Sequence, residues 1–232
     1  MTTRSSTEAL TQAAAILVQE TDTTAVLAQL VEDAAEFVPA DAAALLARTP
    51  SGTFEVLSST SHKVVELELY QAQAAAGPCV DVCRTGRATQ GVGAEEIVAR
   101  WSHVGEAIVK AGFLAVHAFP MRWRGKTLGG MNLFSVRAEH LDATSAALAQ
   151  NFADFATLAV LQPAALADDV LAGRMAAALE GRVIIEQAKG VIAYTKGLDM
   201  SDAYDELVQR ARAQSTTLGQ AAAAVVRGAQ SR

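Results

Sequence analysis

Basic residues near the C-terminus have a spacing that suits contact with phosphate groups. Arg182, Lys189 and Lys196 follow one another at intervals of seven residues, so in an α-helix their side chains lie close to one face. Arg210 and Arg212 supply two further cations. Lysine and arginine side chains contact phosphate oxygens and fix a protein on a nucleic-acid backbone. A line of such residues could follow a strand of nucleic acid.

The charge of the chain is unevenly distributed, and this restricts where a polyanion could bind. The net charge of −6 argues against nonspecific binding of nucleic acid by the whole molecule. Residues 1–173 contain 11 basic and 19 acidic side chains, a net charge of −8, whereas residues 174–232 contain 8 basic and 6 acidic ones, a net charge of +2. Only the C-terminal part is therefore suited to a phosphate backbone.

Residue types that carry catalysis or bind metals form no recognisable site. The histidines have no ligand spacing, and no serine or cysteine has the local signature of an activated nucleophile. The run Gly125-Lys126-Thr127 resembles the end of a phosphate-binding P-loop, but Pro120 stands where that loop requires glycine. We therefore expect neither an enzyme nor a metal site. The four histidines are His62, His103, His117 and His140.

Two cysteines and the absence of long apolar runs indicate the compartment. Cys79 and Cys83 are too few for a disulfide framework, so a reducing environment fits; both can lie on one helical face, which leaves a thiol switch open beside the commoner buried cysteine. No apolar run approaches the roughly 20 residues that span a bilayer. The sequence predicts a cytoplasmic protein with no membrane partner.

The pattern of residues 7–161 predicts an α+β domain. Helical spacing marks two helices in the first forty residues, and again at 62–76, 94–111 and 141–161. Short apolar stretches at 42–48 and 53–59, and at 113–122 and 127–136, flank turn residues and predict two β-hairpins. Helices around a central, mostly antiparallel sheet are therefore expected.

Residues beyond Pro163 have no strand signal and predict helices only. A long helix over 164–194 would make residues 162–173 a helical linker and lead into a three-helix bundle over 174–230. Asp199 is the expected N-cap of the second helix, and Thr217 with Gln220 forms a capping box at the start of the third.

A run of residues in the long C-terminal helix is followed at fixed spacing by residues of the next two helices. The residues Arg182-Val-Ile-Ile-Glu-Gln-Ala-Lys-Gly190 precede Ala203-Tyr204 and then Leu207, Ala211, Leu218, Ala222 and Val225. This pattern resembles the ANTAR family of RNA-binding antiterminators. The order and spacing of all three helices agree with that family. One departure is the loop before the third helix, which reads Ser215-Thr216-Thr217 where the family has a basic residue.

The preceding domain contains a set of short motifs. They are Gly77-Pro78-Cys79-Val80-Asp81, Arg84-Thr85-Gly86, Arg100-Trp101, Val116-His117-Ala118-Phe119-Pro120-Met121, Arg124-Gly125 and Leu128-Gly129-Gly130-Met131-Asn132-Leu133-Phe134. With these motifs the domain is similar, over roughly residues 8–161, to the GAF domain found ahead of ANTAR modules in actinobacterial regulators.

The ANTAR resemblance implies a regulator that binds paired RNA hairpins in nascent transcripts, usually as a homodimer, and so prevents a terminator from forming. Polar contacts, stacking and cations read such loops. Tyr194 is a better stacking candidate than Tyr204, which we expect in the core, and Ala188 and Gly190 are expected to serve helix packing. The candidate RNA-binding residues are Arg182, Gln187, Lys189, Tyr194, Lys196, Arg210 and Arg212.

The GAF resemblance implies a sensory domain. GAF domains often bind small molecules, and Cys79, Trp101 and His117 are the candidate lining of such a pocket, although the residues identify neither a ligand nor a cofactor. A dimerisation scaffold that receives its signal from a protein partner is the equal alternative. In either case the signal would change the register or pairing of the long helix and so present or hide the RNA-binding faces.

Two other functions stay open for the C-terminal bundle. A DNA-binding regulator would need a basic recognition helix, yet Arg227 is the only basic residue among residues 218–227. A dimerisation module that binds proteins and no nucleic acid agrees with the small positive charge.

Overall fold

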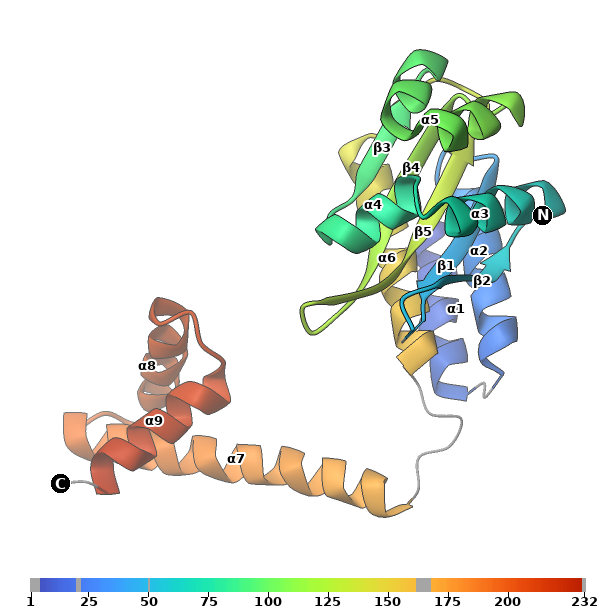
Figure 1. Ribbon diagram of the computed structural model, residues 1–232. Helices are drawn as coiled ribbons and strands as arrows, with labels where there is room; N and C mark the ends of the chain where they lie inside the picture. Colours follow the sequence, from blue (N-terminus) through green and yellow to red (C-terminus); the bar gives the residue numbers. More distant parts are fainter. Residues whose placement is uncertain (1–4, 20–21, 50, 162–167, 231–232) are drawn as a thin grey trace. The chain divides into compact units, whose positions relative to one another are not determined.

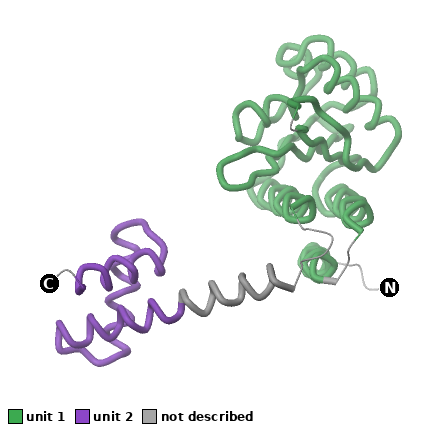
Figure 2. The backbone as a smooth tube through the Cα atoms, turned by 60° about the horizontal axis from the view of Figure 1, so that its bottom comes forward, with its two compact units in different colours: residues 1–165 green, residues 166–232 purple. Residues whose placement is uncertain are grey.

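The protein divides into two compact units, which are described separately. The computed structural model describes residues 5–19, 22–49, 51–161 and 168–230, with the backbone alone at residues 19 and 168–181. Unit 1 covers Met1–Ala165 and unit 2 covers Leu166–Arg232 (Figure 2). The expected helical linker, residues 162–173, lies outside the described residues up to 167; from Asp168 the backbone is helical.

Unit 1 is built on a five-stranded sheet with the order β2-β1-β5-β4-β3, in which all neighbours are antiparallel (Figure 1). The first predicted hairpin is confirmed as β1 (Ala42–Arg48) and β2 (Phe54–Ser59), and the second as β4 (Ala115–Trp123) and β5 (Lys126–Ser135). The short strand β3 (Thr89–Val92) pairs only with β4 and forms one edge. The predicted fold class is confirmed.

One face of the sheet is covered by α1 (Ser6–Gln19), α2 (Thr23–Phe37) and α6 (Ala143–Leu161) (Figure 1). Asp22 caps α2 by accepting from the backbone N–H groups of Thr24 and Ala25. The apolar stripes of these helices pack on inward-facing strand residues such as Leu45, Phe119 and Met131. Burial of these side chains supplies most of the driving force for this layer.

The opposite face is covered by α3 (His62–Ala74), α4 (Pro78–Thr85) and α5 (Ala94–Lys110). Gly77, with φ 121°, ends the connection from α3, and Pro78 occupies the first turn of α4, where its missing N–H is not needed. The segment after Gly77-Pro78, to which the sequence assigned no element, is thus a two-turn helix. It packs across β4 and β5.

Unit 2 is the predicted three-helix arrangement: α7 (Asp168–Lys196), α8 (Met200–Ala213) and α9 (Leu218–Gln230). The predicted caps form, since Asp199 accepts from the Asp202 N–H, and Thr217 and Gln220 exchange hydrogen bonds at 3.0 and 3.2 Å. Helix α9 continues past Gly228 and ends at Gln230. The core joins all three helices and consists mostly of alanine. Its buried residues are Ala188, Ile192, Ala203, Leu207, Ala211, Ala221 and Ala222.

We predict that Gly129→Ala destabilises unit 1 by about 1–3 kcal/mol, the usual cost of overpacking. Gly129 pairs with Ala47 of β1. An added Cβ would clash with the Leu46 carbonyl oxygen and lie 2.9 Å from the Ala47 Cα. Both are backbone atoms, which cannot move away as the end of a flexible side chain can. Denaturant unfolding followed by tryptophan fluorescence reports unit 1 alone, because Trp101 and Trp123 are the chain's two tryptophans.

Gly130→Ala is the matched comparison. Its Cβ would approach a side-chain atom, Cys79 Sγ, at 3.0 Å, so a smaller loss is expected. Equal stability of Gly129→Ala and the unmodified chain would contradict the close approach of β5 to β1.

Candidate functional site

The candidate RNA-binding residues of α7 lie on two different sides of that helix. Lys189 and Lys196 face α8, where their ammonium groups meet Tyr204 and Glu206 respectively. Gln187 and Tyr194 instead line a hollow beside α9. The structure therefore does not bring all seven candidates together, and the two sides have different chemistry.

Lys189 is held within unit 2 by two interactions. Its Nζ donates to Glu186 Oε2 at 2.9 Å and lies 5.8 Å from the centroid of the Tyr204 ring. Its side chain is only 16% exposed. Tyr204 is half exposed, so the expectation that it lies in the core is wrong. The Lys189 ammonium group lies over its ring. The Glu186 carboxylate offsets part of the Lys189 charge, and the small exposed fraction of the side chain limits its contact with a phosphate.

Glu206 forms ion pairs with two more of the candidate cations. Lys196 Nζ donates to Glu206 Oε1 at 2.6 Å, and Arg210 Nε donates to the same oxygen at 2.9 Å. The hydrogen bond from Lys196, followed by that from Arg210, holds the pKa of Glu206 below its usual value. The carboxylate is therefore ionised at neutral pH and offsets part of the positive charge of this side.

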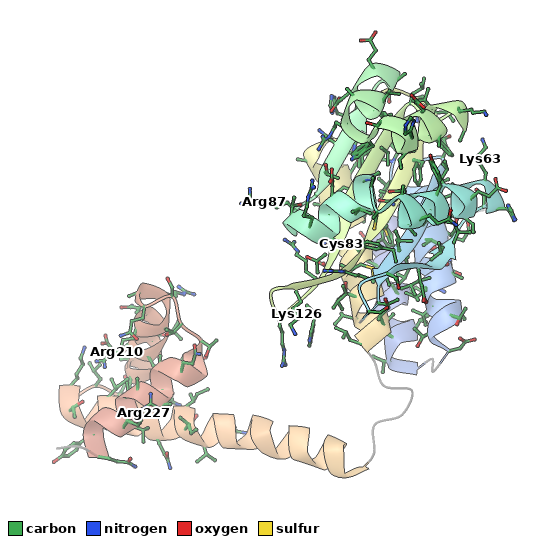
Figure 3. All side chains as sticks on the ribbon, viewed as in Figure 1. Lys63, Cys83, Arg87, Lys126, Arg210 and Arg227 are labelled. Atoms are coloured by element: carbon green, nitrogen blue, oxygen red, sulfur yellow. The ribbon has the colours of Figure 1, made fainter. Side chains whose placement is uncertain are left out.

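The side of α7 next to α9 is hollowed, and its lining contains both apolar and polar side chains. One hollow of about 580 Å³ is lined by Val191, Tyr194 and Val225 together with Arg210 and Gln214 from the end of α8. A second of about 500 Å³ is lined by Gln187, Gly190 and Tyr194 with α9 residues. Tyr194 and Val191 line both, so the two hollows adjoin. Figure 3 labels Arg210 in unit 2.

Tyr194 is the most exposed large apolar side chain of the described residues, at 91%. Tyr194 lines both hollows and is not a member of the buried core cluster described for unit 2. This agrees with its selection as a stacking candidate. Gln214 was not among the candidates, because a helix C-cap glutamine has no local sequence signal that places it beside a helix far along the chain.

The two small residues of the Gln187-Ala188-Lys189-Gly190 segment have different surroundings. Ala188 is fully buried in the core of unit 2, as predicted. Gly190 is exposed, and a Cβ added to it would have no described heavy atom within 4 Å. The expectation that Gly190 serves close helix packing is therefore wrong within the described part of this chain.

Arg182 and Arg212 are the candidate cations whose charges are exposed and have no described ion-pair partner. Both are exposed, and neither forms an ion pair with another described residue. Arg212 stands in the last turn of α8, next along the chain from buried Ala211.

In unit 1 the structure corrects the predicted sensory pocket. Cys79 and Trp101 lie on the α3–α5 side of the sheet, where Cys79 is close to Gly130 and Trp101 belongs to the cluster with Val116 and Phe134. His117 alternates with Val116 on β4 and faces the other side, beside Phe119 and Leu141. The sheet separates His117 from the other two residues, so the three do not line one pocket.

His117 instead lines a hollow of about 300 Å³ at the β3 edge of the sheet, with Thr89, Gln90, Arg100 and Leu141 among its neighbours. Its Nε2 is 3.3 Å from the Glu139 carbonyl oxygen, and burial lowers the pKa of the imidazole, which is neutral at pH 7. Arg100 donates to the Gln90 carbonyl oxygen and, at 2.7 Å, to Thr89 Oγ1. This hollow is the candidate sensory site.

The motif residues around Asp81 hold α4 and α5 together. Trp101 Nε1 donates to Asp81 Oδ2 at 3.0 Å, and Arg84 donates to Asp81 Oδ1 at 2.7 Å. The Cys79 N–H donates to Gln71 Oε1 at 3.3 Å, which ties α4 to α3. These residues therefore have structural roles that the sequence motif does not reveal.

The two thiols of α4 differ in their chemistry. Cys79 is buried, and its hydrogen bond with Cys83 together with burial raises the pKa of its thiol well above the usual value. The same hydrogen bond, with a contribution from the nearby Arg48 charge, lowers the pKa of the partly exposed Cys83 thiol. Cys83 is thus the more nucleophilic of the two. Among the described residues, no group of three histidine, cysteine or acidic side chains could hold a metal ion.

A buried polar cluster lies between α3 and β5. Glu68 Oε1 accepts from Asn132 Nδ2 at 2.7 Å and Glu68 Oε2 accepts from Gln71 Nε2 at 3.1 Å, with all three side chains fully buried. Burial raises the pKa of Glu68 to about 7, and the two hydrogen bonds oppose it only in part. Asn132 Oδ1 has no hydrogen-bond partner within the described residues.

Comparison with known families agrees with both resemblances. A family model for the GAF domain matches residues 22–160, and one for the ANTAR domain matches residues 173–226. The chain belongs to the GAF-ANTAR proteins. GAF domains are sensory and ANTAR domains are RNA-binding antitermination modules; both are regulatory and non-catalytic, which fits a protein that is not an enzyme. A search of the curated proteins found no match.

Solved GAF domains have the fold of unit 1 in this GAF-ANTAR protein. The GAF domain from the Acinetobacter phosphoenolpyruvate-protein phosphotransferase is 8% identical over 66% of this chain and 91% of that one, with a TM-score of 0.53. The corresponding domain from Coxiella burnetii is 15% identical over 67% and 92%, with a TM-score of 0.52. A phycoerythrobilin-bound GAF domain from a cyanobacterial phytochrome is 10% identical over 68% and 95%, also with a TM-score of 0.52.

Within the described ranges of the GAF-ANTAR protein, no helix combines the length and the apolar character needed to cross a bilayer.

We predict that the stability of unit 1 falls as the pH rises from about 4.5 to 7, and that Glu68→Gln removes this fall. The folded pKa of Glu68 lies above its ordinary value of 4.5, so its contribution is fully present below pH 4.5 and is lost as the pH passes 7. The expected loss is about 3 kcal/mol, because each unit of pKa corresponds to about 1.4 kcal/mol.

Urea unfolding of both proteins across this range, followed by tryptophan fluorescence, measures the difference. Glu66→Gln is the control, since Glu66 is exposed and lies two residues from Glu68 on the same helix. The same pH slope in Glu68→Gln and the unmodified chain would show that Glu68 is not the titrating group.

Proposed function

We propose that this GAF-ANTAR protein is a transcription antitermination regulator whose ANTAR domain, as a homodimer, binds hairpin RNA in nascent transcripts in the cytoplasm. In this proposal residues 7–161 sense the signal, residues 162–173 form the helical connection, and residues 174–230 bind RNA. The ANTAR family match over residues 173–226 supports the class of ligand. The surface that would hold the RNA is formed by residues of this domain.

The observation that carries the proposal is Tyr194, a 91% exposed aromatic ring at the junction of two hollows. Hairpin loops present unpaired bases, which proteins bind by stacking on aromatic rings and by hydrogen bonds to base edges. Gln187 and Gln214 stand at the margins of the same hollows with amide groups that can both donate and accept. This combination suits a splayed base better than it suits a DNA groove.

Cations around this surface would contact the phosphates. Arg210 lines the larger hollow, and Arg182 and Arg212 are exposed with no ion pair to a described residue. The net charge of +2 over residues 174–232 is small, and a homodimer would double the cationic surface and add avidity. Lys189, Lys196 and Arg210 contribute less charge, because Glu186 and Glu206 already pair with them.

Control by the GAF domain would act through α7. The hollow beside His117 and Arg100 is the site proposed for a small-molecule signal, with a protein partner as the alternative source. Either signal would change the pairing of α7 helices between two protomers and so present or hide the two RNA-binding surfaces.

We predict that the full-length chain binds tandem-hairpin RNA in preference to matched duplex DNA, with an affinity that falls as salt rises. Tyr194→Ala should weaken RNA binding about tenfold or more, since a stacked base contributes about 1–3 kcal/mol, whereas Tyr194→Phe should retain most of it. Arg212→Ser should lower the slope of log affinity against log salt by about one. Fluorescence anisotropy over a salt series measures both quantities.

Tyr70→Ala is the matched control, because Tyr70 is a 40% exposed tyrosine of unit 1. Sedimentation measures whether the RNA-bound species is a dimer. Equal, weak binding of RNA and DNA by the unmodified chain would rule out antitermination and leave the protein-interaction module as the better account; preference for the duplex would favour the DNA-binding regulator.

We predict opposite effects of Gly190→Ala on stability and on RNA binding. Glycine inside a helix costs about 0.5–1 kcal/mol relative to alanine, and nothing described lies within 4 Å of the added Cβ, so α7 should become more stable by that amount. RNA affinity should fall about threefold to tenfold, because the methyl group would occupy the surface between Gln187 and Tyr194 where the RNA approaches. Amide hydrogen exchange of α7 and RNA anisotropy give the two readouts.

Gly219→Ala, in α9 with equally open surroundings and outside the lining of both hollows, is the control. If Gly190→Ala gains stability and loses no affinity, Gly190 is not part of the RNA surface.

A further inference from the structure

The β4–β5 turn of unit 1 has an unusual residue at its tip. Trp123 and Lys126 pair across a two-residue loop, and both loop residues, Arg124 and Gly125, have positive φ angles of 46° and 80°. Such turns favour asparagine, aspartate or glycine at the first of these positions, because a Cβ is strained in the left-handed region. Arginine is therefore a choice that local stability does not favour, and strained residues of this kind concentrate at functional sites.

The turn concentrates positive charge in an acidic domain. Arg122, Arg124 and Lys126 are exposed, residues 121–138 include no acidic side chain, and none of the three cations forms an ion pair with a described residue. Residues 1–173 as a whole have 11 basic against 19 acidic side chains, a net charge of −8. Lys126 extends outward from the end of the hairpin (Figure 3).

An aromatic ring lies among these cations. Trp123 is 37% exposed, and the Arg124 Cζ lies 5.0 Å from the centroid of its ring. The loop after α4 adjoins the base of the hairpin, since a Cβ on Gly86 would lie 3.4 Å from Thr127 Oγ1, and it adds the exposed Arg87. We call the exposed residues of the hairpin tip and this loop the basic hairpin surface: Arg87, Arg122, Trp123, Arg124 and Lys126. Arg122 and Trp123 are successive residues of β4, so the surface includes both faces of the hairpin.

We propose that the basic hairpin surface is a second RNA-binding surface, which takes single-stranded RNA adjacent to the segment bound by the ANTAR domain. Unpaired cations suit phosphates, and an exposed indole stacked with a guanidinium group suits an unpaired base, whose π-face any sequence offers. An acidic protein would also be attracted by the charges, but the guanidinium group beside an exposed indole is the arrangement on which an unpaired base stacks. The proposal rests on RNA binding by unit 2, because RNA held there is present at high effective concentration for unit 1 of the same chain.

The test compares two RNAs with the full-length chain: tandem hairpins alone, and the same hairpins with a single-stranded oligouridine extension. The extension should raise the affinity of the unmodified chain about tenfold and steepen its salt dependence, since each additional phosphate contact adds about 0.7 to the slope for single strands. The variant Arg122→Ser, Arg124→Ser, Lys126→Ser should lose this gain and still bind the bare hairpins. Lys110→Ser with Arg137→Ser removes two exposed cations elsewhere on unit 1 and should keep the gain.

Two single variants separate binding from folding. Arg124→Asn suits the left-handed position better than arginine, so its thermal unfolding temperature should not fall while the gain from the extension shrinks. Trp123→Ala should reduce the gain and Trp123→Phe should keep it. Ultraviolet crosslinking of free oligouridine to Trp123 tests the surface without the hairpins.

The outcomes distinguish the two proposals. Failure of the unmodified chain to bind bare hairpins refutes the proposed function, and oligouridine crosslinking then decides the basic hairpin surface alone. Binding of bare hairpins with no gain from the extension, or a gain unaffected by the variants, overturns the second surface. Competition by polyglutamate as strong as by oligouridine, with Trp123→Ala unchanged, assigns the surface to an acidic protein instead.

Discussion

The close approach of β5 to its neighbours is the constraint on which the architecture of unit 1 depends. Gly129 lies against the backbone of β1, and Gly130 lies under the Cys79 sulfur of α4, so two successive positions of this strand have no room for a larger residue. Because α4 can settle on the strand at this point, Asp81 reaches the Trp101 indole of α5, and the Cys79 N–H reaches Gln71 of α3. This contact therefore links three helices on one face, in addition to the direct contacts of α3 and α5 with the strands.

The same packing explains the polar cluster beneath α3. Asn132 follows Gly130 on the same face of β5, and its amide meets the buried Glu68 carboxyl group, which burial makes hard to ionise. A carboxyl group with a pKa of about 7 costs little in its neutral form and much more in its charged form. The cluster is thus an internal group whose state depends on pH, held away from the hollow at the β3 edge by the sheet itself.

Sequence patterns predicted what local rules determine and missed what long-range packing determines. The caps at Asp199 and Thr217 and both hairpins follow from residues within a few positions of one another, and each formed as predicted. The seven-residue spacing of Lys189 and Lys196 was also read correctly as one side of a helix. Whether that side is free depends on Glu206, ten residues from Lys196 and brought back by the loop to α8, and the sequence alone does not supply that crossing. The separation of His117 from Cys79 has the same origin, since alternation along β4 says which residues share a face but not which helix covers it.

Gly190 and Arg124 are two of the described residues that contradict local conformational preference. Gly190 lies inside a helix where alanine would be more stable and no neighbour requires its small size, and Arg124 occupies a left-handed turn position where asparagine would be less strained. Neither kind of position is unique, since Ala75, Ser102 and Ser215 also have positive φ angles and Gly219 and Gly228 have equally open surroundings. At Gly129 the reason for the glycine is internal, because backbone atoms leave no space for a Cβ. Gly190 and Arg124 differ from the other positions in what lies next to them. Each of the two residues stands beside an exposed aromatic ring, Tyr194 in one case and Trp123 in the other, which is the pairing that RNA bases would use.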